Sequence, residues 1–462
     1  MKKKVLVLLP DGVGLRNFVY SKFHELGSEE FHIIYWNATN FNLDEIGCEE
    51  IKIKNKKINV FTDFFKNAKT HIELNLNTKN DSNKVYQKYK FPFPKNSLKS
   101  FLKSLFSKLL IFLFNSEKGL KIIRKIIKAL ETKTDYYKDC IATLKSSNPD
   151  FVFCTNQRPV IAIAPILAAQ KLGIPTACFI YSWDNLPKAT LLLETDYYFV
   201  WSKHMFNELK KYYPFIKENQ IKITGTPQFE KHTDSNLIIE KEVFFRNYNL
   251  DVSKKYICFS GDDSTTSPND QLYLRDIAKN IKNLNNLGNN IGVIFRKCPV
   301  DFSDRYDSVL NDYKDIIIPI EPKWKKISEM WDTVFPQKED LELLVNTIYY
   351  TEYVVNVGSS MVFDYITYNK PCFYLNYELQ DKIDKEHYIT KLYDFIHFGS
   401  MPDKDSVIWL NSSDELEQKL LKGFEENLNV IKNAYEWFNV INTHPIEDSS
   451  KRIVSTIKDL IR

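Results

Sequence analysis

Lys4-Val-Leu-Val-Leu-Leu9 is a short, continuous apolar run, and the glycine-containing turn Pro10-Asp11-Gly12-Val13-Gly14 follows it directly. Such a run is typical of a parallel strand that is buried on both faces of its sheet. Beyond the turn, apolar side chains recur at the spacing of one helix face, at Leu15, Phe18, Val19 and Phe23. A strand, a glycine turn and a helix in this order predict the first βα unit of a doubly wound domain.

The same alternation of strand and helix runs through the rest of the chain in two blocks. In the first block we predict strands over residues 150–154, 175–181, 197–201 and 221–224, with helices over 161–172 and 204–212. In the second we predict strands over 255–260, 290–295, 315–320, 353–357 and 372–375, with helices ending near 284 and over 340–349 and 361–368. Alternation of this kind indicates parallel sheets with right-handed crossover connections.

A chain of 462 residues is too long for a single core. We therefore predict an α/β fold of two Rossmann-like, doubly wound parallel-sheet domains that face one another across a cleft. The first would span residues 1–228 and carry a basic helical insertion over about 76–135. The second would span residues 229–446, and residues 447–462 would form a last helix that packs back on the first domain.

Cysteine usage and apolar runs bear on the cellular compartment. The seven cysteines are scattered and include no Cys-x-x-Cys pair, which argues against a disulfide framework or a zinc knuckle and favours a reducing compartment. The N-terminal lysines precede only six apolar residues, Val5 to Pro10, too few for a secretory signal. The longest later run, Leu109 to Phe114, is far shorter than the roughly 20 residues that span a bilayer. We expect a cytoplasmic protein.

The net charge of +4 is unevenly distributed along the chain. Residues 95–128 hold nine basic side chains and one acid, Glu117, so this segment carries +8 and the rest of the chain −4. This indicates a local patch with a partner and not a general nucleic-acid-binding surface. Leucines and phenylalanines alternate with lysines over 98–128, so one interpretation is a helix that lies on an anionic membrane surface. The other is a helical insertion whose apolar face packs on the first domain.

Gly358-Ser359-Ser360 stands directly between a predicted buried strand and a predicted helix. In an open parallel sheet, ligands bind at the carboxyl ends of the strands, and a helix N-terminus there offers unpaired N–H groups to a phosphate. The serine hydroxyls add donors, although an ordinary serine N-cap would have the same sequence. Asp364 lies one helical turn further on the same face, where a carboxylate could accept both hydroxyls of a nucleotide ribose.

Arg296 and Lys297 stand at the carboxyl end of another strand of the same predicted domain. Two cations there would neutralise a diphosphate that the glycine-serine turn also binds, because charge-assisted contacts are about twice as strong as neutral ones. A pair of solvated side chains at a strand end is the alternative interpretation.

Two sets of motifs resemble those of GT-B glycosyltransferases, most closely the bacterial enzymes of surface-polysaccharide assembly. In the second half these are residues 355–360, Asp364 and Asn369-Lys370-Pro371, and in the first half residues 181–185, Trp201-Ser202 and 224–229. The likeness covers residues 150–462, covers 1–30 loosely, and leaves 40–135 unmatched. Cys298-Pro299 departs from the His-Pro pair of the relatives that use CMP-sugars, so a UDP-sugar or another nucleotide-sugar is at least as well supported.

The resemblance implies that the second domain binds a nucleotide-sugar donor and the first a glycan or lipid-linked acceptor, without nucleic acid. Donor contacts would come from Arg296, Lys297, Gly358, Ser359, Ser360 and Asp364. Arg16, Asn17, Trp183 and Asn185 would shape the acceptor side. No cofactor is implied, and neither the histidines nor Asp262-Asp263 have the spacing of a metal site, so we expect no metal ion.

Transfer of a sugar requires a base that takes the proton of the acceptor hydroxyl. Asp11 follows the first strand and Asp184 follows the strand that ends at Tyr181, so both are candidates. Each also has a plainer interpretation, Asp11 as a turn residue before glycine and Asp184 as a helix cap or an acceptor contact. Asp262 and Asp263 follow the first strand of the second half and are further candidates.

Three other functions remain open on the sequence alone. Two are enzymes of the same architecture, a sugar-nucleotide epimerase and a polyol-phosphate transferase. The third is a non-catalytic protein that binds glycans or nucleotides. An epimerase needs neither an acceptor site nor a membrane-facing helix, so the basic segment 98–128 argues mildly against it.

Overall fold

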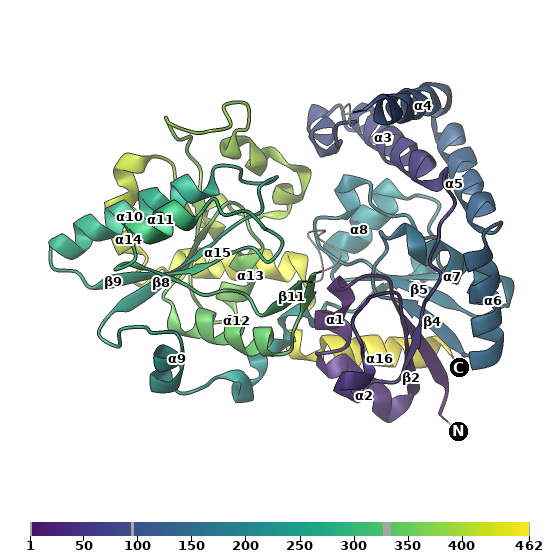
Figure 1. The fold of residues 1–462 in the computed structure, drawn as a ribbon, viewed down its shortest axis with the longest axis horizontal. Coiled ribbons are helices and arrows are strands. Elements are labelled where there is room, and N and C mark those ends of the chain that lie inside the picture. The colour runs from purple at the N-terminus through teal and green to yellow at the C-terminus, as the bar shows by residue number, and fades with distance from the viewer. Residues whose placement is uncertain (1, 94–96, 327–333, 462) are drawn as a thin grey trace. The chain divides into compact units, whose positions relative to one another are not determined.

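A computed structural model describes residues 2–93, 97–326 and 334–461. The chain divides into two compact units, and Figure 1 shows both as ribbons. The first unit comprises Met1–Pro227, Phe395–His397 and Ile441–Arg462, and the second comprises Gln228–Asp394 and Phe398–Val440. That the two units face one another across a cleft stays a prediction.

The first unit is built on a seven-stranded parallel sheet, with the strand order β3-β2-β1-β4-β5-β6-β7. Its strands are β1 (Lys4–Leu9), β2 (His32–Asn37), β3 (Glu50–Lys52), β4 (Phe151–Cys154), β5 (Thr176–Phe179), β6 (Tyr197–Val200) and β7 (Ile221–Ile223). Side chains of β1, β4 and β5 are almost completely buried, as their continuous apolar runs predict. The predicted α/β class is confirmed, and β2 and β3 extend the sheet beyond the predicted strands.

Helices of the first unit connect these strands as crossovers. They are α1 (Val13–Phe18), α2 (Lys22–Glu30), α6 (Asp135–Ser147), α7 (Ile163–Lys171) and α8 (Lys203–Tyr212). The single helical face predicted over 15–23 belongs to two helices. The chain leaves α1 and restarts at Ser21, whose hydroxyl accepts a hydrogen bond from the backbone N–H of Phe23 at 3.2 Å and caps α2.

The inserted region consists of three helices, where the sequence predicted one long helical region. They are α3 (Thr62–Asn80), α4 (Leu98–Phe114) and α5 (Glu117–Glu131). The helices begin before residue 76, because the Asn/Lys-rich stretch near 75–83 is the end of α3. Ser116 separates α4 from α5, since its hydroxyl accepts from the Gly119 backbone N–H at 3.0 Å and starts a new helix. Among the described residues, no helix has both the length and the apolar character needed to cross a bilayer.

The second unit is built on a six-stranded parallel sheet, with the order β10-β9-β8-β13-β14-β15. Its strands are β8 (Lys255–Ser260), β9 (Ile291–Arg296), β10 (Ile317–Pro319), β13 (Val354–Asn356), β14 (Cys372–Leu375) and β15 (Ile408–Leu410), and β11 (Trp324–Lys326) pairs antiparallel with β12 (Val334–Pro336). Its helices are α9 (Lys241–Asn247), α10 (Asp270–Asn286), α11 (Asp307–Asp312), α12 (Glu339–Tyr350), α13 (Met361–Ile366), α14 (Leu416–Lys422) and α15 (Leu428–Ile441).

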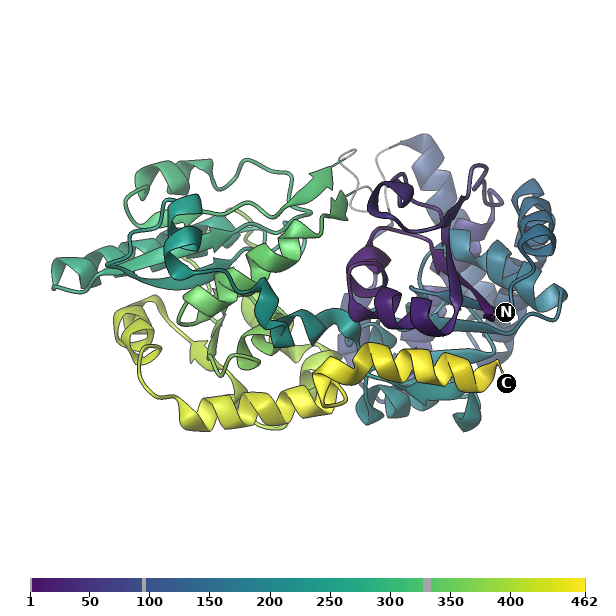
Figure 2. The ribbon, with the colours of Figure 1, turned by 90° about the horizontal axis from the view of Figure 1, so that it is seen from below.

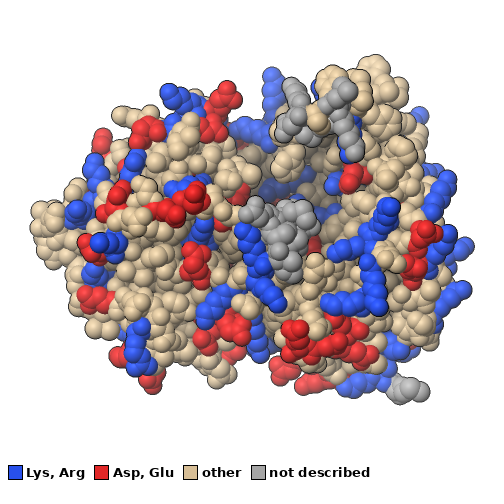
Figure 3. Space-filling model, viewed as in Figure 1, with Lys and Arg blue, Asp and Glu red and all other residues tan. Residues whose placement is uncertain are grey.

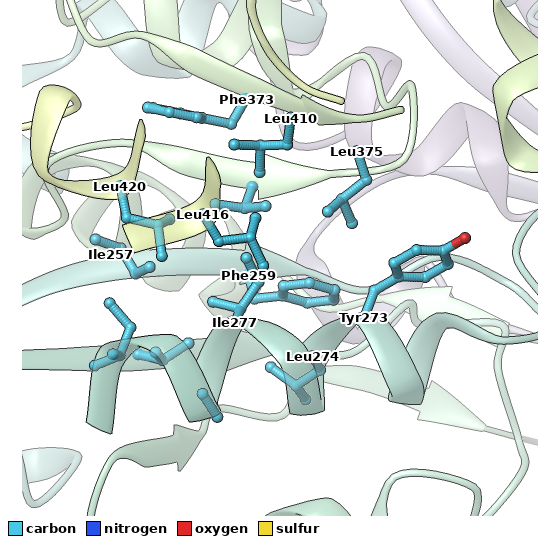
Figure 4. Packing of buried hydrophobic residues seen from close by; sticks show 14 of the residues in the cluster. Ile257, Phe259, Tyr273, Leu274, Ile277, Phe373, Leu375, Leu410, Leu416 and Leu420 are labelled. Carbon is cyan, nitrogen blue, oxygen red and sulfur yellow. The ribbon is translucent and has the colours of Figure 1, made fainter. Parts of the chain in front are cut away.

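The core of the second unit lies between its sheet and two of its helices. Figure 4 shows side chains of β8, β14 and β15 meeting those of α10 and α14. Leu274 and Ile277 point to the sheet because they share one face of α10, at the spacing that the helix period requires. This packing fixes the strands whose carboxyl ends carry the predicted donor residues.

The last helix, α16 (Ser449–Leu460), belongs to the first unit and runs beside α2 (Figure 2). The side chains of Ile453, Val454 and Ile457 form its buried face. Lys458 forms an ion pair with Glu30 of α2. Residues from both ends of the chain therefore complete the same unit.

Candidate functional site

Polar side chains of the first unit gather at the carboxyl ends of three neighbouring strands. Asp11 follows β1, Asn156 follows β4, and Asp184 follows β5. Because β1, β4 and β5 are adjacent and parallel, these residues come to one edge of the sheet. This edge holds the base candidates Asp11 and Asp184 together with the residues predicted for the acceptor, whereas the further base candidates Asp262 and Asp263 lie in the second unit.

Asp11 is held in a fixed orientation at this edge. Its carboxylate accepts a hydrogen bond from the Val13 backbone N–H at 3.2 Å and another from the Asn156 side-chain amide at 2.8 Å. Only 5% of the residue is exposed. The turn role that the sequence allowed is thus present, and Asn156 adds a contact from a strand 145 residues away that sequence reasoning did not identify.

Asp184 sits in a network of donors that keeps it ionised. Its carboxylate accepts hydrogen bonds from the Ser182 hydroxyl at 2.6 Å and the Asn185 amide at 2.9 Å, and it forms an ion pair with Lys188. Burial raises the pKa of Asp184, but Lys188 and the hydrogen bonds lower it by more than burial raises it. The pKa of Asp184 therefore lies well below its usual range. A carboxylate with so low a pKa is a weak proton acceptor.

His397 joins the same edge, although it lies more than 200 residues further along the chain. Its Nδ1 is 3.0 Å from the Tyr89 hydroxyl, and its ring makes an edge-to-face contact with Trp183 at 5.1 Å between centroids. Burial lowers the pKa of His397 to about 3, against the opposing effect of Asp184, so the imidazole is neutral at pH 7. No local motif marks His397 or Tyr89, so sequence reasoning missed both.

The other residues predicted to shape the acceptor side also lie at this edge of the sheet. Arg16 is close enough to Tyr181 to lower the pKa of its hydroxyl, which burial raises above the usual value. Asn185 accepts a hydrogen bond from Gln157 at 2.9 Å. The side-chain oxygen of Asn17 is buried and has no hydrogen-bond partner in the described part of the chain. A buried carbonyl oxygen of this kind is costly unless a ligand hydroxyl or a water satisfies it.

Two strands of the second unit end in residues predicted to bind the donor, and the strand between them ends in two further base candidates. Strand β9 leads into Arg296-Lys297, β8 leads into Gly261-Asp262-Asp263, and β13 leads into Gly358-Ser359-Ser360. The order β9-β8-β13 brings the three segments to one edge of the sheet. The structure therefore gathers the cations and the glycine-serine turn as predicted from the strand pattern, whereas their contacts with a donor stay a prediction.

Arg296 is a buried ion-pair partner and not a solvated strand end. Its Nη2 donates to both carboxylate oxygens of Asp340, at 2.9 and 2.8 Å, and the two side chains are 8% and 2% exposed. Burial raises the pKa of Asp340, but Arg296 and further donors bring it below its usual value. The Nη1 of Arg296 is buried without a hydrogen-bond partner among the described residues. Lys297 is half-buried and donates to the Ser303 carbonyl at 2.5 Å.

The first residue of the glycine-serine turn has a left-handed backbone conformation that only glycine adopts readily. Gly358 has a φ of +64°, and its neighbour Phe398 lies so close that a Cβ would meet the ring at 3.0 Å. Ser359 caps α13, since its hydroxyl accepts from the Met361 N–H at 3.3 Å. The Ser360 hydroxyl makes no capping hydrogen bond. Helix α13 has only six residues, so its dipole is weaker than a long helix would supply.

Asp364 is buried and engaged inside the second unit. Its Oδ1 accepts from His232 Nε2 at 2.7 Å and from Lys231 Nζ at 3.2 Å. Both partners lie in the 3₁₀ helix Pro227–Thr233, about 130 residues earlier. The carboxylate thus anchors the start of the second unit to α13, and ribose binding by Asp364 stays a prediction.

A buried acidic network shapes the loop after β8. The Tyr306 hydroxyl donates to Asp270 at 2.7 Å, the Asp262 backbone N–H donates to the same carboxylate at 3.1 Å, and Arg305 donates to the Asp262 carbonyl at 2.6 Å. Burial raises the pKa of Asp270 to about 6, and burial with Asp270 and Asp263 nearby raises that of Asp262 well above its usual value. Within the described residues, no three His, Cys, Asp or Glu side chains form a group that could hold a metal ion, and metal independence stays a prediction.

Comparison with known proteins identifies the fold. No protein-family model matches the chain, and no protein of curated function matches its sequence. Its structure is similar to that of a putative UDP-N-acetylglucosamine 2-epimerase from Listeria monocytogenes, with a TM-score of 0.55 and 10% identity over 100% of this chain and 97% of that one. It is similar to a glycosyltransferase from Rickettsia africae, with a TM-score of 0.53 and 11% identity over 100% and 98% of the two chains.

The structure is also similar to that of the wall teichoic acid polymerase TagF, with a TM-score of 0.50 and 11% identity over 100% of this chain and 88% of that one. All three similarities span both units of the chain from end to end. The protein therefore has the GT-B fold, two parallel-sheet α/β domains, as the sequence motifs predicted.

Proposed function

We propose that the protein is a glycosyltransferase that moves a sugar from a nucleotide-sugar to a glycan or a lipid-linked acceptor in cell-surface polysaccharide synthesis. The observation that carries the proposal is the gathering of Arg296, Lys297 and the 358–360 turn at the carboxyl ends of β9 and β13. Cations and N–H donors at one sheet edge suit a diphosphate. The GT-B fold supports the proposal, since similar structures include a glycosyltransferase and a putative UDP-N-acetylglucosamine 2-epimerase.

In the donor half, Arg296 and Lys297 would have different roles toward a phosphate. Asp340 already balances the charge of Arg296. Arg296 would therefore offer a phosphate a hydrogen bond from Nη1, and would add little net positive charge. Lys297 forms no ion pair within the described part of the chain and would supply the positive charge. The Ser360 hydroxyl, which caps no helix, would add a further donor. These groups would stabilise the phosphate oxygens as the bond to the sugar breaks.

In the acceptor half, Asp11 is the better base of the two carboxylates. The low pKa of Asp184, which burial alone would raise but Lys188 and the hydrogen bonds more than offset, makes it a poor proton acceptor. Asp11 would take the proton of the acceptor hydroxyl while the acceptor oxygen bonds to the anomeric carbon and the nucleotide leaves with the bonding electrons. Asp184, Asn185 and Trp183 would orient the acceptor, and Asn17 would accept a hydrogen bond from one of its hydroxyls.

The first experiment is a thermal-shift measurement with UDP, CMP, GDP, CDP and dTDP. We expect one nucleotide to raise the melting temperature, because a ligand that binds only the folded state stabilises it by mass action. Ser359→Ala/Ser360→Ala should lose the response. Ser412→Ala/Ser413→Ala is the matched control, since Ser412 also caps a helical turn of the second unit but lies elsewhere. If no nucleotide stabilises the wild type, the donor-site assignment fails.

A second experiment separates transfer from epimerisation. The sugar-nucleotide that matches the best nucleotide is incubated with the protein, with and without an oligosaccharide or lipid-linked acceptor, and followed by NMR. A transferase releases nucleotide only with an acceptor, and Asp11→Asn should abolish release while nucleotide binding persists. Conversion of the sugar-nucleotide into an epimer without an acceptor would establish an epimerase instead.

A further inference from the structure

Helix α4 is an amphipathic helix whose apolar side faces outward. Its buried positions are occupied by Ser104, Ser107 and Leu110. Most of its other large apolar side chains lie on the surface, and we call those at least 50% exposed the α4 face: Phe101, Leu102, Leu105, Leu109, Phe112 and Leu113. A helix on the surface of a water-soluble protein has the opposite arrangement: its apolar stripe packs on the core and its polar residues face the solvent. The inversion needs an apolar partner to cover it.

The neighbouring helix α5 shows that the inversion is specific to α4. Leu120, Ile123 and Ile127 of α5 are buried, whereas Lys118, Lys121 and Lys125 of the same helix are exposed. Helix α5 therefore has the ordinary arrangement and attaches the insertion to the unit, as one of the two interpretations of the sequence requires. That interpretation is wrong for most of α4, because only Leu110 of its leucines and phenylalanines with described side chains is buried and the α4 face is exposed.

The apolar surface continues from α4 onto the start of α3. The ring of Phe106 meets that of Phe64 at 5.6 Å between centroids, and Phe64 lies 6.3 Å from Phe61, which is 50% exposed. Val60, beside Phe61, is 69% exposed. The exposed apolar side chains thus form one patch on α3 and α4 and not a set of isolated residues.

Positive charge surrounds this patch. Lys103 and Lys108 are exposed on α4 itself, and Lys118, Lys121 and Lys125 are exposed on α5. Glu117 is the only acid in the sequence from residue 98 to residue 128. In Figure 3 the surface at the place where Figure 1 draws α4 is mostly tan, with blue side chains beside it. An apolar stripe with a basic rim complements a surface that is apolar inside and anionic outside.

We propose that the α4 face docks on the surface of an anionic lipid bilayer, with its apolar side chains among the acyl chains and the lysines at the head groups. The helix lies in the plane of the interface and does not span the bilayer. A second copy of the chain is a poorer occupant, because two basic rims would repel one another. Docking goes beyond the proposed transferase function, which does not depend on it.

The test is sedimentation of the full chain with vesicles of phosphatidylcholine, with and without phosphatidylglycerol. We expect binding to the anionic vesicles, weakened when NaCl rises from about 0.1 M to about 0.5 M because salt screens the lysines. Leu105→Glu/Leu109→Glu/Phe112→Glu should lower the partition coefficient at least about ten-fold, since each change places a charge in the apolar contact. Circular dichroism and the nucleotide response check that this variant is folded.

Two matched variants make the result specific. Val252→Glu/Leu287→Glu/Ile383→Glu places three acids at equally exposed apolar sites of the second unit and should bind as the wild type does. Lys103→Gln/Lys108→Gln/Lys118→Gln should lose the preference for anionic vesicles, whereas Lys279→Gln/Lys282→Gln/Lys314→Gln should keep it.

Three results would overturn the proposal. The wild type fails to bind anionic vesicles at low salt, or the α4 variant binds as well as the wild type. Alternatively, the wild type is a dimer by light scattering, does not bind lipid, and becomes a monomer when the α4 face is changed, which would make a second copy the occupant. None of these results depends on nucleotide binding or sugar transfer, so the proposed function is tested separately.

Discussion

The buried pair of Arg296 and Asp340 allows the structural and the ligand-binding roles of Arg296 to be measured separately. Arg296→Met leaves the Asp340 carboxylate without its cation in a site that is only 2% exposed. Loss of one partner of a buried ion pair costs about 3–5 kcal/mol. Trp324 Nε1 and the Lys323 N–H still donate to Asp340, at 2.8 and 2.9 Å, so we expect the lower end of this range. A loss of about 3 kcal/mol lowers Tm by about 6–12 °C in a unit of this size.

The double variant Arg296→Met/Asp340→Asn removes both charges and keeps one acceptor oxygen, which can serve either the Lys323 N–H, now bonded to Oδ1, or the Trp324 Nε1–H, now bonded to Oδ2. We expect it to regain part of the stability and to cost about 1–2 kcal/mol, because no uncompensated charge is left in the core and only one donor loses its acceptor. Thermal and urea unfolding of the wild type, each single variant and the double variant give the coupling energy of the pair.

Nucleotide binding by the stabilised double variant then reports on the ligand role of Arg296. If Arg296 also contacts the donor through Nη1, the double variant stays stable but gives a smaller nucleotide-induced shift than the wild type. The reasoning is refuted if Arg296→Met unfolds at the wild-type temperature, or if the double variant is as unstable as the single one. Either result would mean that the charge pair does not hold β9 to α12.

Asp270→Asn should raise the unfolding free energy at pH 7 by up to about 3 kcal/mol, since burial raises the pKa of Asp270 from 3.8 to about 6. Between those two pKa values the native state binds a proton that the unfolded state does not, so the unfolding free energy of the wild type falls as pH rises from about 4 to about 6. Urea unfolding should show this fall for the wild type and not for the variant. Equal pH dependence of the two unfolding free energies would contradict the prediction. Gly358→Ala should cost about 1–2 kcal/mol for its φ of +64°, plus the displacement of Phe398. Gly173→Ala, with a φ of +73° in open space, should show the backbone cost alone, and equal losses in calorimetry would exclude any effect of Phe398.

The sequence predicted the parallel sheets and the placement of the site residues at strand ends, because continuous apolar runs and their following turns are local signals. β3 was missed since three half-buried residues give no period. The partners of the site residues were missed for a different reason. Asp340, His232 and His397 meet their partners only through the fold, across 44 or more positions of chain, and no local pattern links them.

Helix α4 marks another limit of sequence reasoning. Its periodicity places most of its apolar residues on one side of the helix, but the period is the same whether that side points to the core or to the solvent. The direction was settled by Ser104 and Ser107, whose small side chains allow α4 to pack closely on the other helices of the insertion. A polar residue with a small volume is easily taken for part of a solvated surface.

The position of α16 has a consequence for how the protein is made. Strands β1 to β7 have all left the ribosome once the chain has been synthesised to residue 223 and far enough beyond it to fill the exit tunnel. The helix that covers α2, α16, has not yet been synthesised at that point. At ordinary translation rates of about 5–20 residues per second, more than about ten seconds separate the two. During that interval the surface of α2 that contacts Val454 is uncovered, so the first unit to be translated is the last to be finished. Until its own C-terminal segment is synthesised, the nascent chain leaves this part of α2 without the helix that covers it in the folded unit.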